Sequence, residues 1–172
     1  VADAVRDGDR IEPPAGPFAN GLAIAAELIR TRPSTRVVTV SASGFDTHSR
    51  QADQHHALLA DLGAGLDHFW RQLESSGDAE RVLLFTTSEF GRRVAQNASD
   101  GTDHGSAGLS IVMGPSVIGG LHGAIDTDRL QEGDLVPVFD PRTMFTAAID
   151  WLGGDAERVL GRRWDDLRLL RS

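Results

Sequence analysis

The sequence contains no cysteine, and all 17 of its basic residues are arginines. Without cysteine the chain forms neither disulfides nor zinc–thiolate sites, so any metal ion must be bound by oxygen and imidazole ligands. Without lysine it cannot form a Schiff base with a substrate, and it lacks the phosphate-binding loop that depends on a lysine. These two absences exclude several classes of enzyme before any motif is considered.

Long apolar runs and excess positive charge are missing as well. No apolar stretch approaches the ~20 residues that a membrane-spanning helix needs, and no signal peptide is visible. The formal net charge of −8 argues against binding to nucleic acids or to anionic membranes. What is present is a chain of 172 residues, 40% of them hydrophobic, which is long enough for one domain with a sizeable core.

The first sixteen residues differ in composition from the rest. Residues 1–16 are polar and contain several prolines and glycines, which is typical of a linker or a frayed start. The chain begins with Val1 rather than methionine, so we expect a further segment upstream in the complete protein. We expect residues 17–172 to form a single domain.

Hydrophobic periodicity predicts the fold class. Apolar residues at helical spacing predict helices over about 18–30, 53–75 and 141–153. Continuous runs with β-branched residues predict buried strands over 36–43, 81–88 and 108–114, and "VIGGLHGAI" predicts a short strand or hairpin arm. Because strands alternate with helices, the predicted fold class is α/β with a mostly parallel sheet.

Polar residues stand where the predicted strands end. Asp46 and His48 follow the first strand, Glu89 stands at the end of the second, and the pair Asp103 and His104 lies in the loop before the third. In open α/β sheets, ligands bind outside the carboxyl ends of the strands. Carboxylates and imidazoles suit Zn, Mn or Fe and, with more oxygen ligands, Mg or Ca. The three clusters together therefore predict a site for one or two divalent metal ions.

Each cluster alone also has a simpler interpretation. Asp-Thr and Asp-Gly sequences are common turn formers, so the same residues would serve ordinary loops. Arg92 and Arg93 follow "SEFG", and one of them is placed to bind an oxyanion or else to form a surface salt bridge. A serine nucleophile lacks support, because the motif G-x-S-x-G is absent.

The remaining histidines are weaker candidates for a site. His55 shares the apolar face of the long predicted helix with Leu59, so we expect it to be packed. We expect His68 on the solvent side of that helix and His122 in a surface hairpin.

Four motifs, in their order and spacing, resemble those of a known family. They are "VVTVSASGFDTHSRQ", "VLLFTTSEFGRR", "GTDHGSAG" and "GDLVPVFDPRTMFTAAIDWLG". From about Phe18 to its end, the chain resembles the C-terminal part of the proteins with domain of unknown function 1501 (DUF1501). The resemblance extends to the alkaline-phosphatase-like superfamily, which includes sulfatases and cofactor-independent phosphoglycerate mutases.

This resemblance implies a fold and a metal site. The fold would be a three-layer sandwich of helices around a mostly parallel sheet, and it would hold two divalent ions. The positions that match the ligands of one ion are Asp46, His48 and His104, with Asp103 beside them as a ligand or as the partner of a ligand. The metal would be Zn, Mn, Ca or Mg.

The sequence departs from the superfamily at the second ion. Glu89 and Phe90 stand where relatives carry an Asp-His pair, and Phe90 cannot coordinate a metal, so this ion would have one ligand fewer. The remaining aspartate ligand and the Ser/Thr nucleophile of the superfamily lie in an N-terminal half that is not part of this sequence. Similarity to exported proteins with twin-arginine signals implies an exported or periplasmic location.

The leading hypothesis is a metal-dependent hydrolase of phosphate or sulfate esters, with Glu89 and Arg92 as catalytic residues. Its partners would be a small-molecule ester and the N-terminal half. The alternative is a non-catalytic exported module of the same fold that binds a metal or another ligand. A third hypothesis is an assembly domain whose polar clusters only form turns.

Overall fold

The computed structural model describes residues 15–164 and 167–171. Most of the predicted linker, residues 1–14, therefore lies outside the described residues. The chain divides into two compact units, one formed by Val1–Asp46 with Asp53–Ala79 and the other by Thr47–Ala52 with Glu80–Ser172. We call them the first unit and the second unit. The single domain over residues 17–172 stays a prediction.

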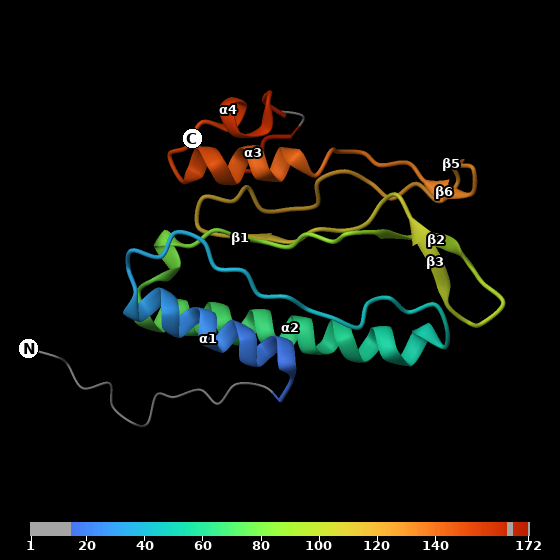
Figure 1. The fold of residues 1–172 in the computed structure, drawn as a ribbon, viewed down its shortest axis with the longest axis horizontal. Coiled ribbons are helices and arrows are strands. Elements are labelled where there is room, and N and C mark those ends of the chain that lie inside the picture. Colours follow the sequence, from blue (N-terminus) through green and yellow to red (C-terminus); the bar gives the residue numbers. More distant parts are fainter. Residues whose placement is uncertain (1–14, 165–166, 172) are drawn as a thin grey trace, which may run out of the picture. The chain divides into compact units, whose positions relative to one another are not determined.

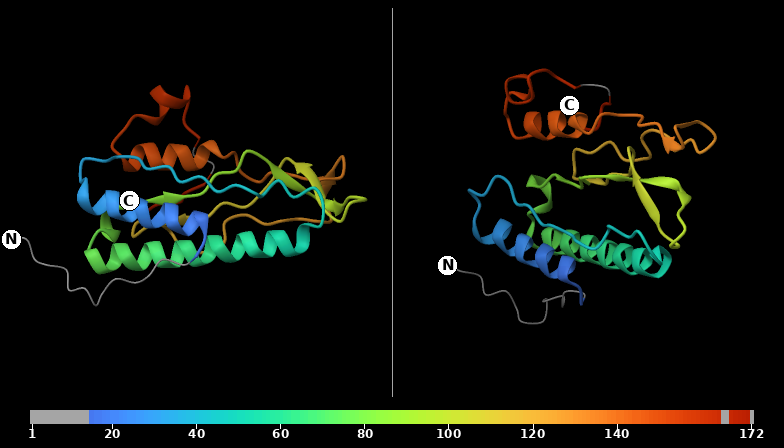
Figure 2. Two further views of the ribbon diagram at one scale, coloured as in Figure 1. Left: turned by 60° about the horizontal axis from the view of Figure 1, so that its bottom comes forward. Right: turned by 45° about the vertical axis from the view of Figure 1, so that its right-hand side comes forward.

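The first unit is built on two helices that lie side by side (Figures 1 and 2). Helix α1 spans Pro17–Thr31, and helix α2 spans Gln51–Ser76, its first two residues belonging to the second unit. Pro17 stands in the first turn of α1, where its missing N–H is not needed. Both helices begin and end within two residues of the predicted positions, so these two predictions are confirmed.

Apolar side chains of both helices are buried and form the core of the first unit. They are Ala19, Leu22, Ala25 and Ala26 of α1 and Leu66, Phe69 and Leu73 of α2. Gly65 of α2 allows a close approach, because a Cβ there would lie 3.1 Å from the Cα of Ala19 and 3.3 Å from Cδ1 of Leu22. The glycine therefore determines which face of α2 turns toward α1.

The buried face of α2 is centred differently from the predicted one. Leu59, expected in the core, is 49% exposed, whereas His68, expected in solvent, is 4% exposed. The Nε2 atom of His68 has no hydrogen-bond partner among the described residues. His68 lies one turn from Gly65 on the same helix face. Glycine has no side chain and so does not contribute to a hydrophobic periodicity. The periodicity therefore did not reveal the helix face that Gly65 and His68 share, and the prediction for His68 was wrong.

The segment between the two helices was expected to contain a buried strand, and this prediction was also wrong. Residues 36–43 form no strand, and Val37 is 70% exposed. β-branched residues favour an extended backbone, but a strand also requires a neighbour whose N–H and C=O groups pair with its own. No strand of the described residues pairs with this segment. Asp46 and His48 therefore follow a segment that is not a strand.

The described residues of the second unit form short strands in three antiparallel pairs (Figure 1). The pairs are β1 (Leu84–Phe85) with β4 (Val112–Met113), β2 (Gly91–Gln96) with β3 (Thr102–Gly105), and β5 (Leu130–Gln131) with β6 (Asp134–Leu135). The predicted strands 81–88 and 108–114 are thus found only as β1 and β4. The hairpin β2–β3 was not predicted, since its residues were expected to form loops. The three-layer fold around a mostly parallel sheet stays a prediction.

The C-terminal part of the second unit is helical. Helix α3 spans Arg142–Trp151, as predicted, and the unpredicted short helix α4 spans Ala156–Leu160. A 3₁₀ helix, η1, spans Ala79–Arg81. In place of the short strand or hairpin arm expected in "VIGGLHGAI", the described residues form an isolated bridge between Val117 and Leu170. No helix among the residues described is long and apolar enough to cross a membrane.

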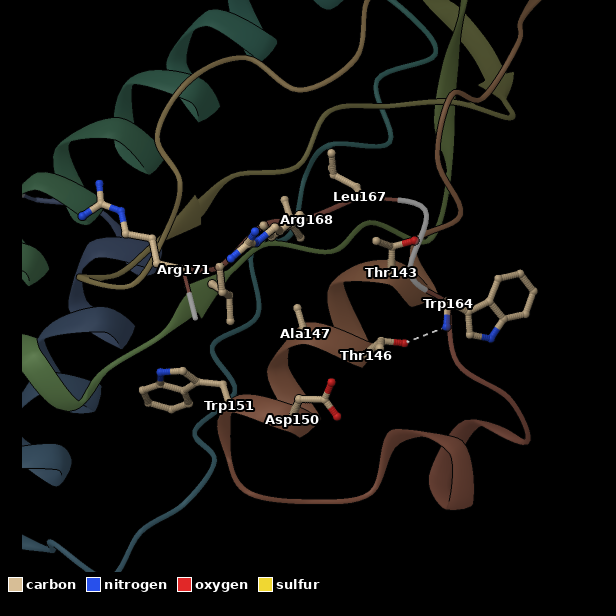
Figure 3. A pocket seen from close by; sticks show the side chains of 11 residues that line it. Thr143, Thr146, Ala147, Asp150, Trp151, Trp164, Leu167, Arg168 and Arg171 are labelled. Atoms are coloured by element: carbon tan, nitrogen blue, oxygen red, sulfur yellow. Dashed lines mark hydrogen bonds between the residues drawn. The ribbon is translucent and has the colours of Figure 1, made fainter.

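A hollow of about 330 Å³ lies between α3 and the C-terminal segment (Figure 3). Thr146 of α3 accepts a hydrogen bond from the backbone N–H of Trp164 across 3.3 Å at its edge. Two guanidinium groups, those of Arg142 and Arg162, each lie 3.6 Å from the centroid of the Trp164 ring. These cation–π contacts join the start of α3 to the segment that follows α4.

Candidate metal site

Two histidines that are far apart in the sequence lie next to each other in the second unit. His48 stands just before α2, and His104 lies in β3. Their ring centroids are 4.8 Å apart, and the rings are tilted by 34°. The pairing of β3 with β2 (Figure 1) positions His104, which lies opposite Arg92 in the register of this hairpin. The hairpin therefore brings His104 next to His48, and so joins two of the three clusters predicted from the sequence.

Asp46 completes a group of three potential ligands. One ligand atom of each of Asp46, His48 and His104 lies within 4.8 Å of the others, and all three residues are exposed. Asp46 is joined to His48 through Thr47 alone, and Thr47 is only 2% exposed. An extended backbone directs residues i and i+2 to one side and residue i+1 to the other. The buried threonine thus anchors a short segment that presents Asp46 and His48 on the same side.

Aromatic stacking supports the second histidine. The ring of Phe90 lies parallel to that of His104, with an interplanar angle of 4° and the centroids 4.0 Å apart. The guanidinium group of Arg92 lies 5.0 Å from the centroid of the Phe90 ring and donates a hydrogen bond to the backbone oxygen of Thr102 across 2.7 Å. Phe90, which cannot coordinate a metal, instead restricts the orientation of a residue that can.

Asp103 contacts a candidate ligand and does not belong to the group of three. Its Oδ1 lies 3.4 Å from Nδ1 of His48 and accepts a hydrogen bond of 3.1 Å from the side-chain amide of Asn97. The hydrogen bond from Asn97, and after it the one from His48, holds the pKa of the Asp103 carboxyl below its usual value. A carboxylate on one nitrogen of an imidazole leaves the other nitrogen available for a metal ion.

A family model described as "Protein of unknown function (DUF1501)" matches residues 2–169 of this sequence. The chain belongs to the DUF1501 family. The resemblance of the four motifs to this family is thereby confirmed, whereas the relation to the alkaline-phosphatase-like superfamily stays a prediction. Comparison with curated proteins and with solved structures finds no match.

The other residues predicted for the site of this DUF1501 chain lie outside the group of three. Glu89 is exposed in the segment before β2 and does not contribute to the group. Arg92 is bonded to the hairpin backbone, as described above. The catalytic roles of Glu89 and Arg92, and the role of Glu89 as a metal ligand, stay predictions.

Two further histidines take part in other contacts. His55 is half-buried in α2, and its ring packs edge-on against that of Phe45, with the centroids 6.0 Å apart. His122 is exposed, and its Nε2 lies 2.9 Å from the backbone oxygen of Ile118. The expectation that His55 is packed is confirmed.

The donor set of the DUF1501 chain fits a divalent metal ion. One carboxylate and two imidazoles are typical ligands of Zn²⁺ and Mn²⁺, and also suit Fe²⁺. Ligand atoms about 2.0–2.2 Å from a common ion stand at most about 4.4 Å apart. Atoms within 4.8 Å of one another on exposed side chains reach this spacing by small side-chain rotations. Three protein ligands also leave coordination positions for water or a substrate.

Sequence reasoning missed two residues that support this arrangement. Asn97 was not considered, although "NASDG" between two short runs is a typical turn sequence and a signal for a hairpin. Phe90 was considered only as a residue that cannot coordinate a metal. Its contact with His104 could not be predicted without the register of β2 and β3.

Proposed function

We propose that Asp46, His48 and His104 bind a divalent metal ion, and that this site belongs to a metal-dependent hydrolase of phosphate or sulfate esters. The observation that carries the proposal is the convergence of three ligand atoms within 4.8 Å from two segments far apart in the sequence. A carboxylate and two imidazoles without any thiolate favour Zn²⁺ or Mn²⁺, with Mg²⁺ and Ca²⁺ less well suited to two nitrogen ligands.

A divalent ion bound there would polarise an ester oxygen and lower the pKa of a coordinated water. Asp46, His48 and His104 would hold the ion and leave its remaining positions open to the substrate. Arg92 would neutralise negative charge on the ester after turning from the Phe90 ring, and Glu89 would bind a water molecule or a second ion. The ester as the substrate class follows from the resemblance to the alkaline-phosphatase-like superfamily, to which the four DUF1501 motifs point. By the same resemblance, the protein would be exported, and an N-terminal half would supply the nucleophile.

One observation favours a second candidate function, a non-catalytic module that binds a metal or another ligand. The ring of Phe90 stacks on that of His104 with the centroids 4.0 Å apart. By the resemblance, Phe90 stands where alkaline-phosphatase-like hydrolases would carry a ligand for a second ion. A site with one ion and one face closed by an aromatic ring can bind a ligand without turning it over.

The test is metal binding by the purified protein. We expect it to bind about one equivalent of Zn²⁺ or Mn²⁺ in isothermal titration calorimetry, with the stoichiometry checked by elemental analysis. His48→Ala combined with His104→Ala should weaken binding at least about 100-fold, since even changes behind the ligands cost 10–100-fold. His122→Ala is the matched control, because it removes an exposed histidine elsewhere in the second unit.

Two results would contradict the metal site: no metal bound by the unaltered protein, or equal affinities of the unaltered protein and the double variant. Aryl phosphate and aryl sulfate esters then separate the two functions when they are tested on the full-length protein, because the N-terminal half would supply the nucleophile. Metal-dependent release of the aryl alcohol supports the hydrolase, whereas bound metal without release supports the binding module.

A further inference from the structure

The loop that connects β2 and β3 is built around the side chain of Asn97. Its Oδ1 accepts hydrogen bonds from the backbone N–H groups of Ser99 (2.9 Å) and Gly101 (3.0 Å). The backbone N–H of Asn97 donates to the oxygen of Gly101 across 2.8 Å. These three hydrogen bonds close the loop, and the two that Oδ1 accepts orient the amide group.

The other end of the same amide reaches out of the loop. Its Nδ2 donates one hydrogen bond to the backbone oxygen of His48 (3.0 Å) and one to Oδ1 of Asp103 (3.1 Å). An amide NH₂ has two hydrogens, and both are used here. A flipped amide would place donors against the N–H groups of Ser99 and Gly101, so the hydrogen-bond network assigns the orientation without ambiguity.

The loop also binds the backbone that follows His48. The N–H groups of Arg50 and Gln51 donate to the oxygens of Ser99 (2.9 Å) and Asp100 (2.8 Å). Gly101 is buried against the same segment, where a Cβ would overlap the carbonyl group of His48 and lie 2.6 Å from the nitrogen of Ser49. The hairpin that carries His104 is therefore tied directly to the segment that carries His48.

We propose that Asn97 is a positioning residue that prepares His48 for metal binding, an inference that rests on the proposed metal site. It acts in two ways: its amide holds the backbone oxygen of His48, and it holds the Asp103 carboxylate 3.4 Å from Nδ1 of the imidazole. The carboxylate favours the tautomer with the proton on Nδ1. Nε2 would then carry the lone pair for a metal ion, as in the carboxylate–histidine–metal arrangement of known sites.

The experiment compares Asn97→Asp with the unaltered protein. Aspartate keeps an acceptor for Ser99 and Gly101 but removes both donors and adds a negative charge beside Asp103. We expect Zn²⁺ affinity to fall about 10–100-fold, as for other residues behind metal ligands. In the metal-free protein at about pH 8, ¹⁵N-resolved NMR should show His48 mainly protonated on Nδ1, and this preference should be lost in the variant. The far-UV spectrum of the variant is compared with that of the unaltered protein. If the two spectra agree, a change of tautomer cannot be attributed to loss of fold.

Two further variants complete the design. Asp103→Ala removes the carboxylate that faces Nδ1 of His48. Asp103 is exposed and takes no part in closing the loop, so this variant tests the positioning role if Asn97→Asp fails to fold. It should reproduce the change of tautomer. Asp126→Ala is the control, because Asp126 closes another turn by accepting the N–H groups of Asp128 and Arg129. It should leave zinc affinity and the His48 tautomer unchanged.

The outcomes distinguish this inference from the proposed function. If the unaltered protein binds no metal, the proposed function fails, and a Nδ1–H tautomer that depends on Asn97 still supports the positioning role. Suppose instead that the unaltered protein binds zinc and that Asn97→Asp has the same zinc affinity and the same His48 tautomer. The positioning role is then wrong, and the metal site stands. If Asn97→Asp does not fold, the same comparison is made with Asp103→Ala.

Discussion

His48 is the residue at which most of the observed contacts of the site meet. Its ring faces His104 and the Asp103 carboxylate, and its backbone oxygen is bound by Asn97. Each of these contacts comes from the β2–β3 hairpin or its loop. The chemistry of a single imidazole is therefore controlled by residues about 50 positions away in the sequence.

At the residue scale, a substitution of Gly101 tests the contact between the hairpin loop and His48. A Cβ at this position would overlap the His48 carbonyl, and the backbone on either side would have to move. We expect Gly101→Ala to destabilise the protein by about 1–3 kcal/mol, as overpacking typically does, and to weaken zinc binding more than 10-fold. Thermal unfolding and titration calorimetry measure the two effects.

Gly119→Ala is the matched control for this change, since nothing lies within 4 Å of a Cβ at Gly119. The close packing of Gly101 against His48 would be contradicted if the two alanine variants had the same melting temperature and the same zinc affinity.

At the scale of elements, the helices were predictable and the strand pairs were not. The bounds of α1, α2 and α3 follow from apolar periodicity, proline and glycine, which act within a few residues of one another. The apolar segment 36–43 has the pattern of a buried strand by the same local criteria but forms no strand. Conversely, the polar β2 and β3 are paired because the Asn97 loop closes between them.

The contacts of Asp140 at the start of α3 should make the stability of the protein depend on pH. Asp140 accepts hydrogen bonds from the side chain and from the backbone N–H of Arg142, and these lower the pKa of Asp140 to about 2. The pKa of an aspartate in the unfolded chain is about 3.9. A carboxyl whose pKa is lowered by folding stabilises the native state above the unfolded pKa, and this contribution is lost as the pH falls from about 4 to about 2.

We therefore expect Asp140→Asn to lower the melting temperature at pH 6, and we expect its difference from the unaltered protein to shrink toward pH 2. Asp128→Asn, in an exposed turn of the same unit, serves as the control and should show no such trend. Melting curves at several pH values measure the effect. A difference that stays constant between pH 6 and pH 2 would exclude the ion pair with Arg142 as its cause.

At the scale of the whole molecule, a metal bound only by the folded chain must raise its stability. At a free metal concentration of 100 times the dissociation constant, the gain is about 2.7 kcal/mol. We expect the melting temperature to be higher with Zn²⁺ than with a chelator, and we expect this difference to vanish when His48 and His104 are both alanine. Equal melting temperatures of the unaltered protein in the two conditions would favour the assembly-domain hypothesis, in which the polar clusters only form turns.

By itself the sequence determined the chemistry that is available: carboxylates and imidazoles without thiolate or lysine, an i, i+2 pair at Asp46 and His48, and three helices. It also determined membership of the DUF1501 family. Only the tertiary structure decided that His104 meets His48, that Asp103 contacts Nδ1, and that Phe90 and Asn97 support the two rings. The reason is physical: helical periodicity and turn preference act between near neighbours, whereas the pairing of a hairpin with a distant segment depends on hydrogen bonds that neither segment can form alone.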